Sequence, residues 1–171
     1  RIVRWRRAVD RLLTTFPFEA ALFEGSGLPA TFVGHPGFVP PLPPPRTGER
    51  WPGGGPCTVE LLPGSRRQEI EFHAPLLLDA AVEVAKRLPA ARFVVRLAEP
   101  AHEEIFEAAA AAGGARERPP ALEVRVGPAA EPSPDAPLLG AIAASGTVTA
   151  ELGAALVPMA VFYRVSPLTR L

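Results

Sequence analysis

Apolar positions follow two different periods from residue 57 to the end of the chain. Short continuous apolar runs, typical of buried strands, alternate with stretches in which apolar residues recur every three or four positions, as on one face of a helix. The predicted strands are 57–62, 91–98, 122–127, 138–144 and 158–165, and the predicted helices are 68–88, 102–112 and 145–156. Because helices of this length between strands form parallel βαβ units, the pattern predicts an α/β protein with a doubly wound parallel sheet.

The first 35 residues follow a similar pattern over a shorter length. Residues 1–13 carry arginines mostly on one helical face and an apolar stripe on the other, made of Ile2, Trp5, Val9 and Leu12. This predicts an amphipathic helix, which either packs its stripe into a core, the commoner case, or lies on an anionic membrane surface. A short strand, a helix over 17–24 and a strand over 30–33 are expected next, with Pro17 in the first turn of that helix.

Residues 36–56 consist largely of Pro and Gly and contain almost no aliphatic side chain. A segment of this composition cannot pack a core and is expected to be extended or disordered. The main interpretation is a linker between two domains, and a proline-rich ligand for a small recognition domain is the alternative.

The composition of the chain narrows the classes of function. Its 171 residues are 47% hydrophobic and 21% charged, which is typical of a globular protein. Lys and Arg together number 18, as do Asp and Glu, so the formal net charge is zero. This balance argues against a nucleic-acid-binding protein, which usually carries a basic excess.

Other features bear on metals, membranes and completeness. Cys57 is the only cysteine, which excludes an internal disulfide and a multi-cysteine zinc site, and we expect it to be a small buried side chain. No paired His or Cys spacing suits a metal, so no metal or other cofactor is expected. The apolar run 138–163 is interrupted by glycines, a glutamate and a proline, so no membrane span is expected. The chain starts with Arg1, and we expect it to be a piece of a longer protein.

Two predicted turns, each leading from a strand into a helix, carry residues suited to ligand chemistry. In an open parallel sheet, ligands bind at such turns beyond the carboxyl ends of the strands. In the first turn, Gly64 allows a ligand to approach the backbone closely. Ser65 can donate a hydrogen bond, and the Arg66 guanidinium can place two N–H groups on phosphate oxygens.

The second turn opens a helix with Ser145, Gly146 and Thr147. The N–H groups and positive dipole end of a helix start favour a phosphate or diphosphate. Thr149 adds a hydroxyl, and Glu151, one to two turns further, can accept hydrogen bonds from sugar hydroxyls. Helix capping is the commoner explanation of either turn alone. Two such turns on one sheet make a phosphate site an equal alternative.

The three histidines give weaker signals. His73 and His102 fall within predicted helices, and we expect both on the surface. His35 follows a predicted strand at the edge of the linker, where a hinge between domains would lie, and the sequence leaves its role open.

Five short motifs occur along the chain in a fixed order. They are FPFE at 16–19, FVGHP at 32–36, LLPGSR at 61–66 followed by Glu69 and Ile70, ASGT at 144–147 followed by Thr149 and Glu151, and PM at 158–159 followed by Tyr163, Arg164 and SPLT at 166–169. In this order they resemble the lipid-A-disaccharide synthase family. Any one motif is weak, whereas five in sequence over nearly the whole chain are specific.

The resemblance implies a B-type inverting glycosyltransferase with two Rossmann-like domains and the active site between them. Residues 1–35 would be the end of the N-terminal, acceptor-side domain, 36–56 the linker, and 57–171 a truncated C-terminal, donor-side domain. Members of the family transfer 2,3-diacylglucosamine from UDP-2,3-diacylglucosamine to 2,3-diacylglucosamine 1-phosphate and release UDP, without a cofactor. The resemblance further implies lipid A biosynthesis in the cytoplasm of a Gram-negative bacterium, at the inner-membrane surface, which the missing half would contact.

By the same resemblance, the two turns would bind the UDP of the donor. The implied residues are Gly64, Ser65, Arg66, Ser145, Gly146, Thr147, Thr149 and Glu151, with His35 at the hinge or cleft. No catalytic residue is assigned, because the general base is expected in the missing N-terminal half. The chain alone should therefore bind UDP weakly without turnover.

The chain departs from the family pattern at several places. The linker after the Gly-His-Pro motif has a different sequence from that of the family. In the helix before Glu151, Val148 and Ala150 replace the residues that the family has there. The family's Leu-Pro-Asn segment is absent, because the chain has no Asn. Another UDP-sugar enzyme of the same fold, a UDP-N-acetylglucosamine transferase or 2-epimerase, is one alternative. A non-catalytic nucleotide-binding module is another. The FPFE and LLPGSR runs favour the synthase family.

Overall fold

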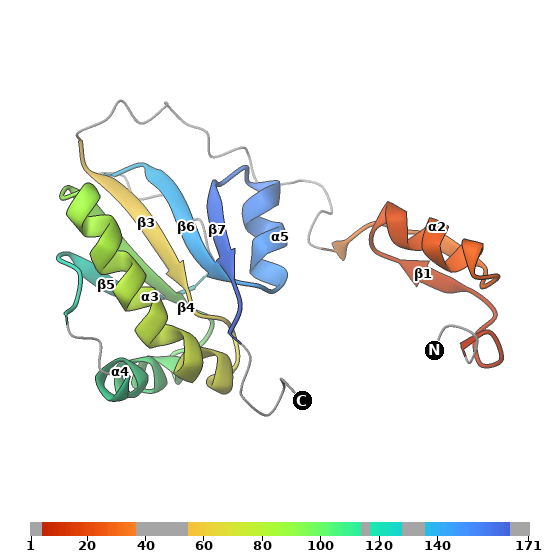
Figure 1. Cartoon of the computed structure of the whole chain (residues 1–171), viewed down its shortest axis with the longest axis horizontal. Coiled ribbons are helices and arrows are strands. Elements are labelled where there is room, and N and C mark those ends of the chain that lie inside the picture. Colours follow the sequence, from red (N-terminus) through yellow and green to blue (C-terminus); the bar gives the residue numbers. More distant parts are fainter. Residues whose placement is uncertain (1–4, 37–54, 114–116, 128–135, 165–171) are drawn as a thin grey trace. The chain divides into compact units, whose positions relative to one another are not determined.

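The chain divides into two compact units, Arg1–Leu42 and Pro43–Leu171. The computed structural model describes residues 5–36, 55–113, 117–127 and 136–164 of them (Figure 1). The division falls inside the Pro- and Gly-rich segment 36–56.

The first unit is a single βαβ element. It consists of β1 (Leu12–Thr14), α2 (Pro17–Gly25) and β2 (Ala30–Phe32). The two strands pair in parallel. Glu19 caps the start of α2, because its Oε2 accepts the backbone N–H of Phe16 at 3.1 Å. The helix and the second strand agree with the sequence prediction to within one residue.

The helix predicted over residues 1–13 is wrong in the part that the structure describes. Trp5 is helical, a turn follows it, and Leu12 already lies in β1. The backbone N–H of Leu12 donates to the carbonyl of Pro29 at 2.8 Å, so pairing with the chain that enters β2 replaces the helical hydrogen bond. Ile2 lies outside the described residues.

The first unit buries few of its apolar side chains. Leu28 and Ala30 are buried. Among the described residues, the large apolar side chains that remain exposed are Trp5, Val9, Leu13, Phe16, Phe18, Leu22, Phe32 and Val33. A two-stranded sheet with one helix offers too little surface to cover them.

The second unit is an open sheet of five parallel strands in the order β5-β4-β3-β6-β7. Its elements are β3 (Cys57–Leu62), α3 (Arg67–Arg87), β4 (Ala91–Leu97), α4 (His102–Ala112), β5 (Leu122–Val126), β6 (Leu138–Ala144), α5 (Thr147–Ala154) and β7 (Met159–Phe162). The chain starts in the middle at β3, winds outward to β5, then returns to β6 beside β3 and continues to β7 (Figure 1). This is the doubly wound parallel sheet that the sequence predicts, so the fold class is confirmed.

Helices cover both faces of the sheet. The larger core lies under α3 and α4 and is built mainly from Val59, Leu61, Ile70, Leu77, Leu78, Phe93, Val95, Leu97 and Phe106. A smaller core lies under α5 on the opposite face, where Leu62, Ala141 and Ala143 meet Leu152, Ala155 and Val157. Cys57 is buried in the larger core, as predicted. Within the described ranges, no helix combines the length and apolar character that crossing a membrane requires.

Candidate functional site

The two predicted turns leave neighbouring strands at the carboxyl edge of the sheet. β3 and β6 pair in parallel with Leu62 beside Ala143, so the turn after each strand begins at the same edge. The chain continues into α3 on one face and into α5 on the other, which makes this edge the switch point of the sheet (Figure 1). Open α/β sheets bind ligands in the crevice at such a point.

The first turn has a backbone conformation that requires glycine. Gly64 has a φ of +112°, in the region that other residues rarely adopt. A Cβ at Gly64 would lie 2.5 Å from Oε2 of Glu69, which is too close for any side chain. Ser65 and Arg66 follow as exposed residues and lead directly into α3.

Glu69 occupies the hydrogen-bond donors of this turn. Its Oε2 accepts the backbone N–H groups of Ser65 at 3.1 Å and Arg66 at 3.3 Å, and its Oε1 accepts from the Arg66 guanidinium at 3.1 Å. Glu69 thereby caps the start of α3. The first turn is therefore capped, but by the Glu69 carboxylate and not by the hydroxyl of Ser65. The same donors that would hold a phosphate hold a carboxylate.

The second turn is open to solvent. Ser145, Gly146 and Thr147 are exposed, and a Cβ at Gly146 would meet no atom within 4 Å. The backbone N–H of Ser145 donates to the carbonyl of Phe162 at 2.8 Å, which fixes the turn to the end of β7. Among the described residues no side chain caps α5, whose N-cap residue is Gly146. The Thr149 hydroxyl donates to the carbonyl of Gly146 at 2.7 Å. The amino end of α5 is thus accessible to an anion.

The remaining predicted residue of this turn, Glu151, is exposed on α5. It lies four residues after Thr147, so the two side chains share one side of the helix. The structure therefore brings the two turns to adjacent strand ends. Most of their predicted residues are solvent-accessible, and Gly64 and Thr149 are half-buried.

His73 joins two strand ends at this edge. Its side chain is 1% exposed, so the prediction that it lies on the surface is wrong. Nδ1 lies 2.7 Å from the carbonyl oxygen of Pro63, and Nε2 accepts the backbone N–H of Arg164 at 3.3 Å. The ring also meets the rings of Phe162 and Tyr163 edge-on, with centroids 5.0 Å and 5.6 Å away.

The spacing of apolar residues along α3 and α4 already indicates that His73 and His102 are buried. His73 lies three residues after Ile70 and four before Leu77, on the stripe of α3 that faces the core. His102 is 8% exposed and lies four residues before the buried Phe106 on α4, so its predicted surface position is also wrong. Among the described residues, its Nδ1 has no hydrogen-bond partner.

His35, the predicted hinge residue, lies in the first unit just after β2. It is half-buried, and its ring packs against Phe16 with centroids 5.6 Å apart. A role for His35 at a hinge or cleft stays a prediction.

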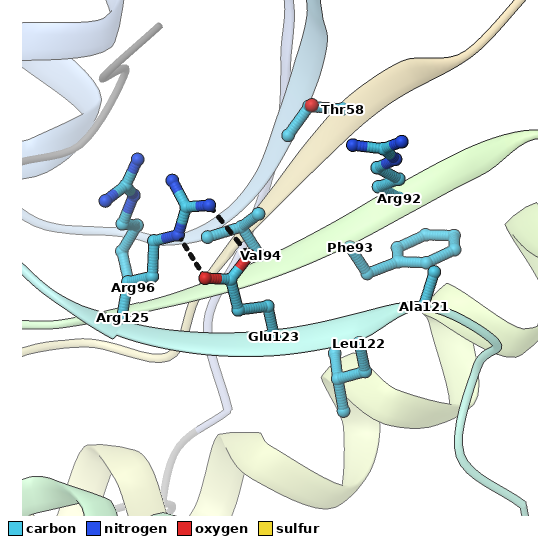
Figure 2. Close-up of a pocket in the computed structure, with 9 residues that line it drawn as sticks. All are labelled: Thr58, Arg92, Phe93, Val94, Arg96, Ala121, Leu122, Glu123 and Arg125. Carbon is cyan, nitrogen blue, oxygen red and sulfur yellow. Dashed lines mark hydrogen bonds and ion pairs between the residues drawn. The ribbon is translucent and has the colours of Figure 1, made fainter. Parts of the chain in front are cut away.

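A cavity of about 220 Å³ lies elsewhere in the second unit, against strands β3, β4 and β5 (Figure 2). Its lining consists of Thr58, Arg92, Phe93, Val94, Arg96, Ala121, Leu122, Glu123 and Arg125, and no residue of the two turns is among them. The arginines of β4 alternate with residues of the larger core, so they lie on the face that α3 and α4 do not cover.

Ion pairs take up much of the charge around this cavity. Arg125 donates from Nε to Glu123 at 2.6 Å, and this hydrogen bond lowers the pKa of Glu123 (Figure 2). Arg96 donates from Nε to Glu60 at 2.9 Å, and these two side chains are 3% and 0% exposed. Because Arg96 and Glu60 contact each other, each of these buried charges is balanced by an opposite charge in place of solvent.

The sheet order, the helices on both faces and the glycine turns at the switch point define a Rossmann-like α/β domain. In the part of the chain that the structure describes, no three His, Cys, Asp or Glu side chains are grouped to hold a metal ion.

The chain belongs to the lipid-A-disaccharide synthase family, because the family model described as lipid-A-disaccharide synthetase matches residues 1–171. This confirms the resemblance carried by the five motifs.

Curated proteins with the same name are similar over nearly the whole chain. The lipid-A-disaccharide synthase of Burkholderia mallei is 40% identical over 178 residues, which cover 99% of this chain and 43% of the relative. The enzyme of the same name from Thiobacillus denitrificans is 39% identical over 182 residues, covering 99% and 44%. That of Bordetella parapertussis is 36% identical, covering 99% and 45%. The chain therefore spans less than half the length of these relatives.

Proposed function

We propose that this chain is the donor-side part of a lipid-A-disaccharide synthase, with the end of the acceptor-side domain attached. The whole enzyme would transfer 2,3-diacylglucosamine from UDP-2,3-diacylglucosamine to 2,3-diacylglucosamine 1-phosphate, with inversion and release of UDP. Membership of the family supports the reaction. The observation that most strongly supports the site is the register of β3 and β6, which starts both turns at one switch point.

The proposed reaction places new negative charge on the UDP. The bond between the anomeric carbon and the β-phosphate oxygen breaks, while the acceptor hydroxyl forms the new glycosidic bond and gives its proton to a general base. Preorganised donors aimed at the leaving phosphate lower the barrier of such a step. The amino end of α5 with Ser145 and Thr147, and the Arg66 guanidinium with Ser65, supply those donors. Glu151 would accept hydrogen bonds from ribose or sugar hydroxyls.

The Glu69 carboxylate sets a condition on this site. It holds Arg66 and the N–H groups of the first turn, so a diphosphate must compete for them. The side chain of Arg66 is 81% exposed, which leaves its guanidinium accessible to a ligand without unfolding the turn. Arg66 is therefore the first-turn residue that we expect to reach the diphosphate.

The same proposal assigns the parts of the chain. Residues 1–35 form the end of the acceptor-side domain, 36–56 the linker and 57–171 the donor-side domain. The general base belongs to the part of the enzyme outside this chain. The enzyme would act in the cytoplasm at the inner-membrane surface, with UDP-2,3-diacylglucosamine and 2,3-diacylglucosamine 1-phosphate as its partners.

Calorimetric titration of the 171-residue chain with UDP tests the site, with Arg66→Ala and Arg67→Ala as matched variants. Both arginines are exposed and each pairs with a glutamate on α3, at 3.1 Å for Arg66 and 2.8 Å for Arg67. Loss of a charged hydrogen bond to phosphate should weaken UDP about tenfold in Arg66→Ala and leave Arg67→Ala unchanged. No heat of binding and no thermal stabilisation at about 10 mM UDP, in a folded sample, would refute the donor site.

UDP binding alone does not separate the synthase from another UDP-sugar enzyme of the same fold. A chimera, in which this chain replaces the matching segment of the Burkholderia mallei synthase, makes that separation. Formation of the lipid disaccharide by the chimera supports the synthase. A folded chimera that binds UDP but forms no disaccharide favours the other enzymes.

A further inference from the structure

The imidazole of His73 contacts backbone on both sides of the proposed donor site. On one side is the carbonyl of Pro63, the residue between β3 and Gly64. On the other is the backbone N–H of Arg164, two residues beyond β7. Since β6 lies between β3 and β7 in the sheet, the ring spans the strand that carries the second turn.

The two contacts favour one tautomer of the ring. A carbonyl oxygen only accepts hydrogen bonds, so Nδ1 must carry a proton toward Pro63. A backbone N–H only donates, so Nε2 must present its lone pair to Arg164. The geometry therefore favours the tautomer that carries its proton on Nδ1.

The same ring is linked to the second turn through β7. Its edge-on contact with Phe162 brings it to the residue whose carbonyl accepts the N–H of Ser145 at 2.8 Å. A continuous set of contacts thus runs from Pro63 through His73 and Phe162 to Ser145. One end adjoins Gly64 and the other begins the turn into α5.

We propose that His73 is a positioning residue that sets the spacing between the two turns and thereby increases the affinity of the site for a nucleoside diphosphate. The inference rests on the proposed UDP site. His73 touches no ligand in this scheme and acts through Pro63, Arg164 and Phe162. A ligand that engages both turns should depend on it more strongly than a ligand that engages one.

Two substitutions separate its two hydrogen bonds. The amide nitrogen of His73→Asn can replace Nδ1 and keep the bond to Pro63, whereas the amide oxygen of His73→Gln can replace Nε2 and accept from Arg164. Each variant loses one of the two hydrogen bonds, and the loss of one ordinary hydrogen bond corresponds to about a fivefold decrease in affinity. His102→Gln is the matched control, because it alters another buried histidine of the same unit, which lies on α4 rather than on α3.

The test measures the affinities of UDP and UMP for the 171-residue chain and these variants. We expect both His73 variants to bind UDP about fivefold more weakly, with a smaller loss for UMP, and His102→Gln to keep the UDP-to-UMP ratio. General destabilisation would weaken both nucleotides equally, and that result would overturn the inference. If the unaltered chain binds no UDP, the donor site and this inference fall together. If it binds UDP and the ratio does not change in the His73 variants, only the inference falls.

A second measurement holds even where a variant fails to fold. In the unaltered chain, the imidazole nitrogen resonances of His73 should show a protonated Nδ1 and an unprotonated Nε2 at neutral pH. The amide resonance of Ser145 should also shift in any folded His73 variant. A proton on Nε2, or a Ser145 resonance that stays unchanged in a folded variant, would overturn the inference.

Discussion

Gly64 and Glu69 fit against each other so closely that a Cβ at Gly64 would stand 2.5 Å from the Glu69 carboxylate. The contact closes the first turn at the switch point. It links the accessible backbone of this turn to the first turn of α3. A substitution of either residue is therefore expected to disturb both the turn and the start of the helix.

Gly64→Ala should destabilise the second unit. The new methyl group meets the Glu69 side chain, and φ of +112° disfavours any residue with a Cβ, for a cost of about 1–3 kcal/mol in the free energy of unfolding. Chemical denaturation measures it. Gly153→Ala is the matched control, because this glycine lies inside α5 with its nearest neighbour 3.8 Å from the new Cβ. That variant should be more stable than the unaltered chain by about 0.5–1 kcal/mol. Equal effects of the two substitutions would contradict the prediction.

Glu69→Gln should weaken the start of α3. The amide keeps one acceptor oxygen but loses the charge that attracts both N–H groups and the Arg66 guanidinium. Loss of this cap should cost about 1 kcal/mol of stability, read from the midpoint of thermal unfolding.

The control for Glu69→Gln is Glu71→Gln on the same helix. Glu71 pairs with Arg67 on the exposed surface, where an ion pair contributes little, so its loss should cost about 0.5 kcal/mol or less. The capping interpretation of Glu69 fails if both variants unfold at the same temperature.

The Glu60–Arg96 pair should be strongly coupled in its effect on stability. Arg96→Met leaves the Glu60 charge buried beside a neutral side chain, and a broken buried pair costs about 3–5 kcal/mol. The double variant Glu60→Leu, Arg96→Met should be more stable than either single variant, because no buried charge is left. Lys86→Met, which breaks an exposed pair with Glu83, should leave the free energy of unfolding nearly unchanged, because solvent screens that pair. Additive single effects in the double variant would show that the pair is not coupled.

Cys57 should resist alkylation in the native state. Burial raises the pKa of its thiol, because the thiolate would lose its solvation in the core. The neutral thiol is therefore the form that the fold favours. The stability that the protonated Cys57 thiol contributes is complete below the unfolded-state pKa of about 8.5. It is lost as the pH rises through the higher pKa that the thiol has in the folded state.

Mass spectrometry after iodoacetamide treatment at about pH 8 reads this one site, since the chain has a single cysteine. We expect slow labelling of the native chain and rapid labelling in denaturant. Labelling of the native chain at the rate of a free thiol would contradict the burial of Cys57.

Regular periodicity made most of the second unit predictable. α4 and β6 coincide with the predicted ranges 102–112 and 138–144, because each is a clear apolar pattern bounded by Pro or Gly. The error at residues 1–13 has the opposite origin, since a helical stripe there is overridden by the pairing of Leu12 with the chain entering β2.

The site was predictable only in outline. The two turns could be placed at one sheet edge, because parallel strands end together. The carboxylate of Glu69 in the first turn and the burial of His73 depend on how α3 rotates against the sheet. The partner of the buried Glu60 lies 36 residues away on β4, and no local pattern joins the two. The role of the predicted residues in binding UDP stays a prediction.

The exposed apolar side chains of the first unit bear on how the chain unfolds. With two strands and one helix, this unit lacks the buried area that gives a domain a cooperative transition of its own. A melting curve of the 171-residue chain should therefore contain one sharp transition, from the five-stranded sheet. Residues 5–36 should add a gradual loss of signal that begins at lower temperature. Trp5, one of two tryptophans in the chain, stacks on Phe23 within the small unit and would report that gradual phase by fluorescence.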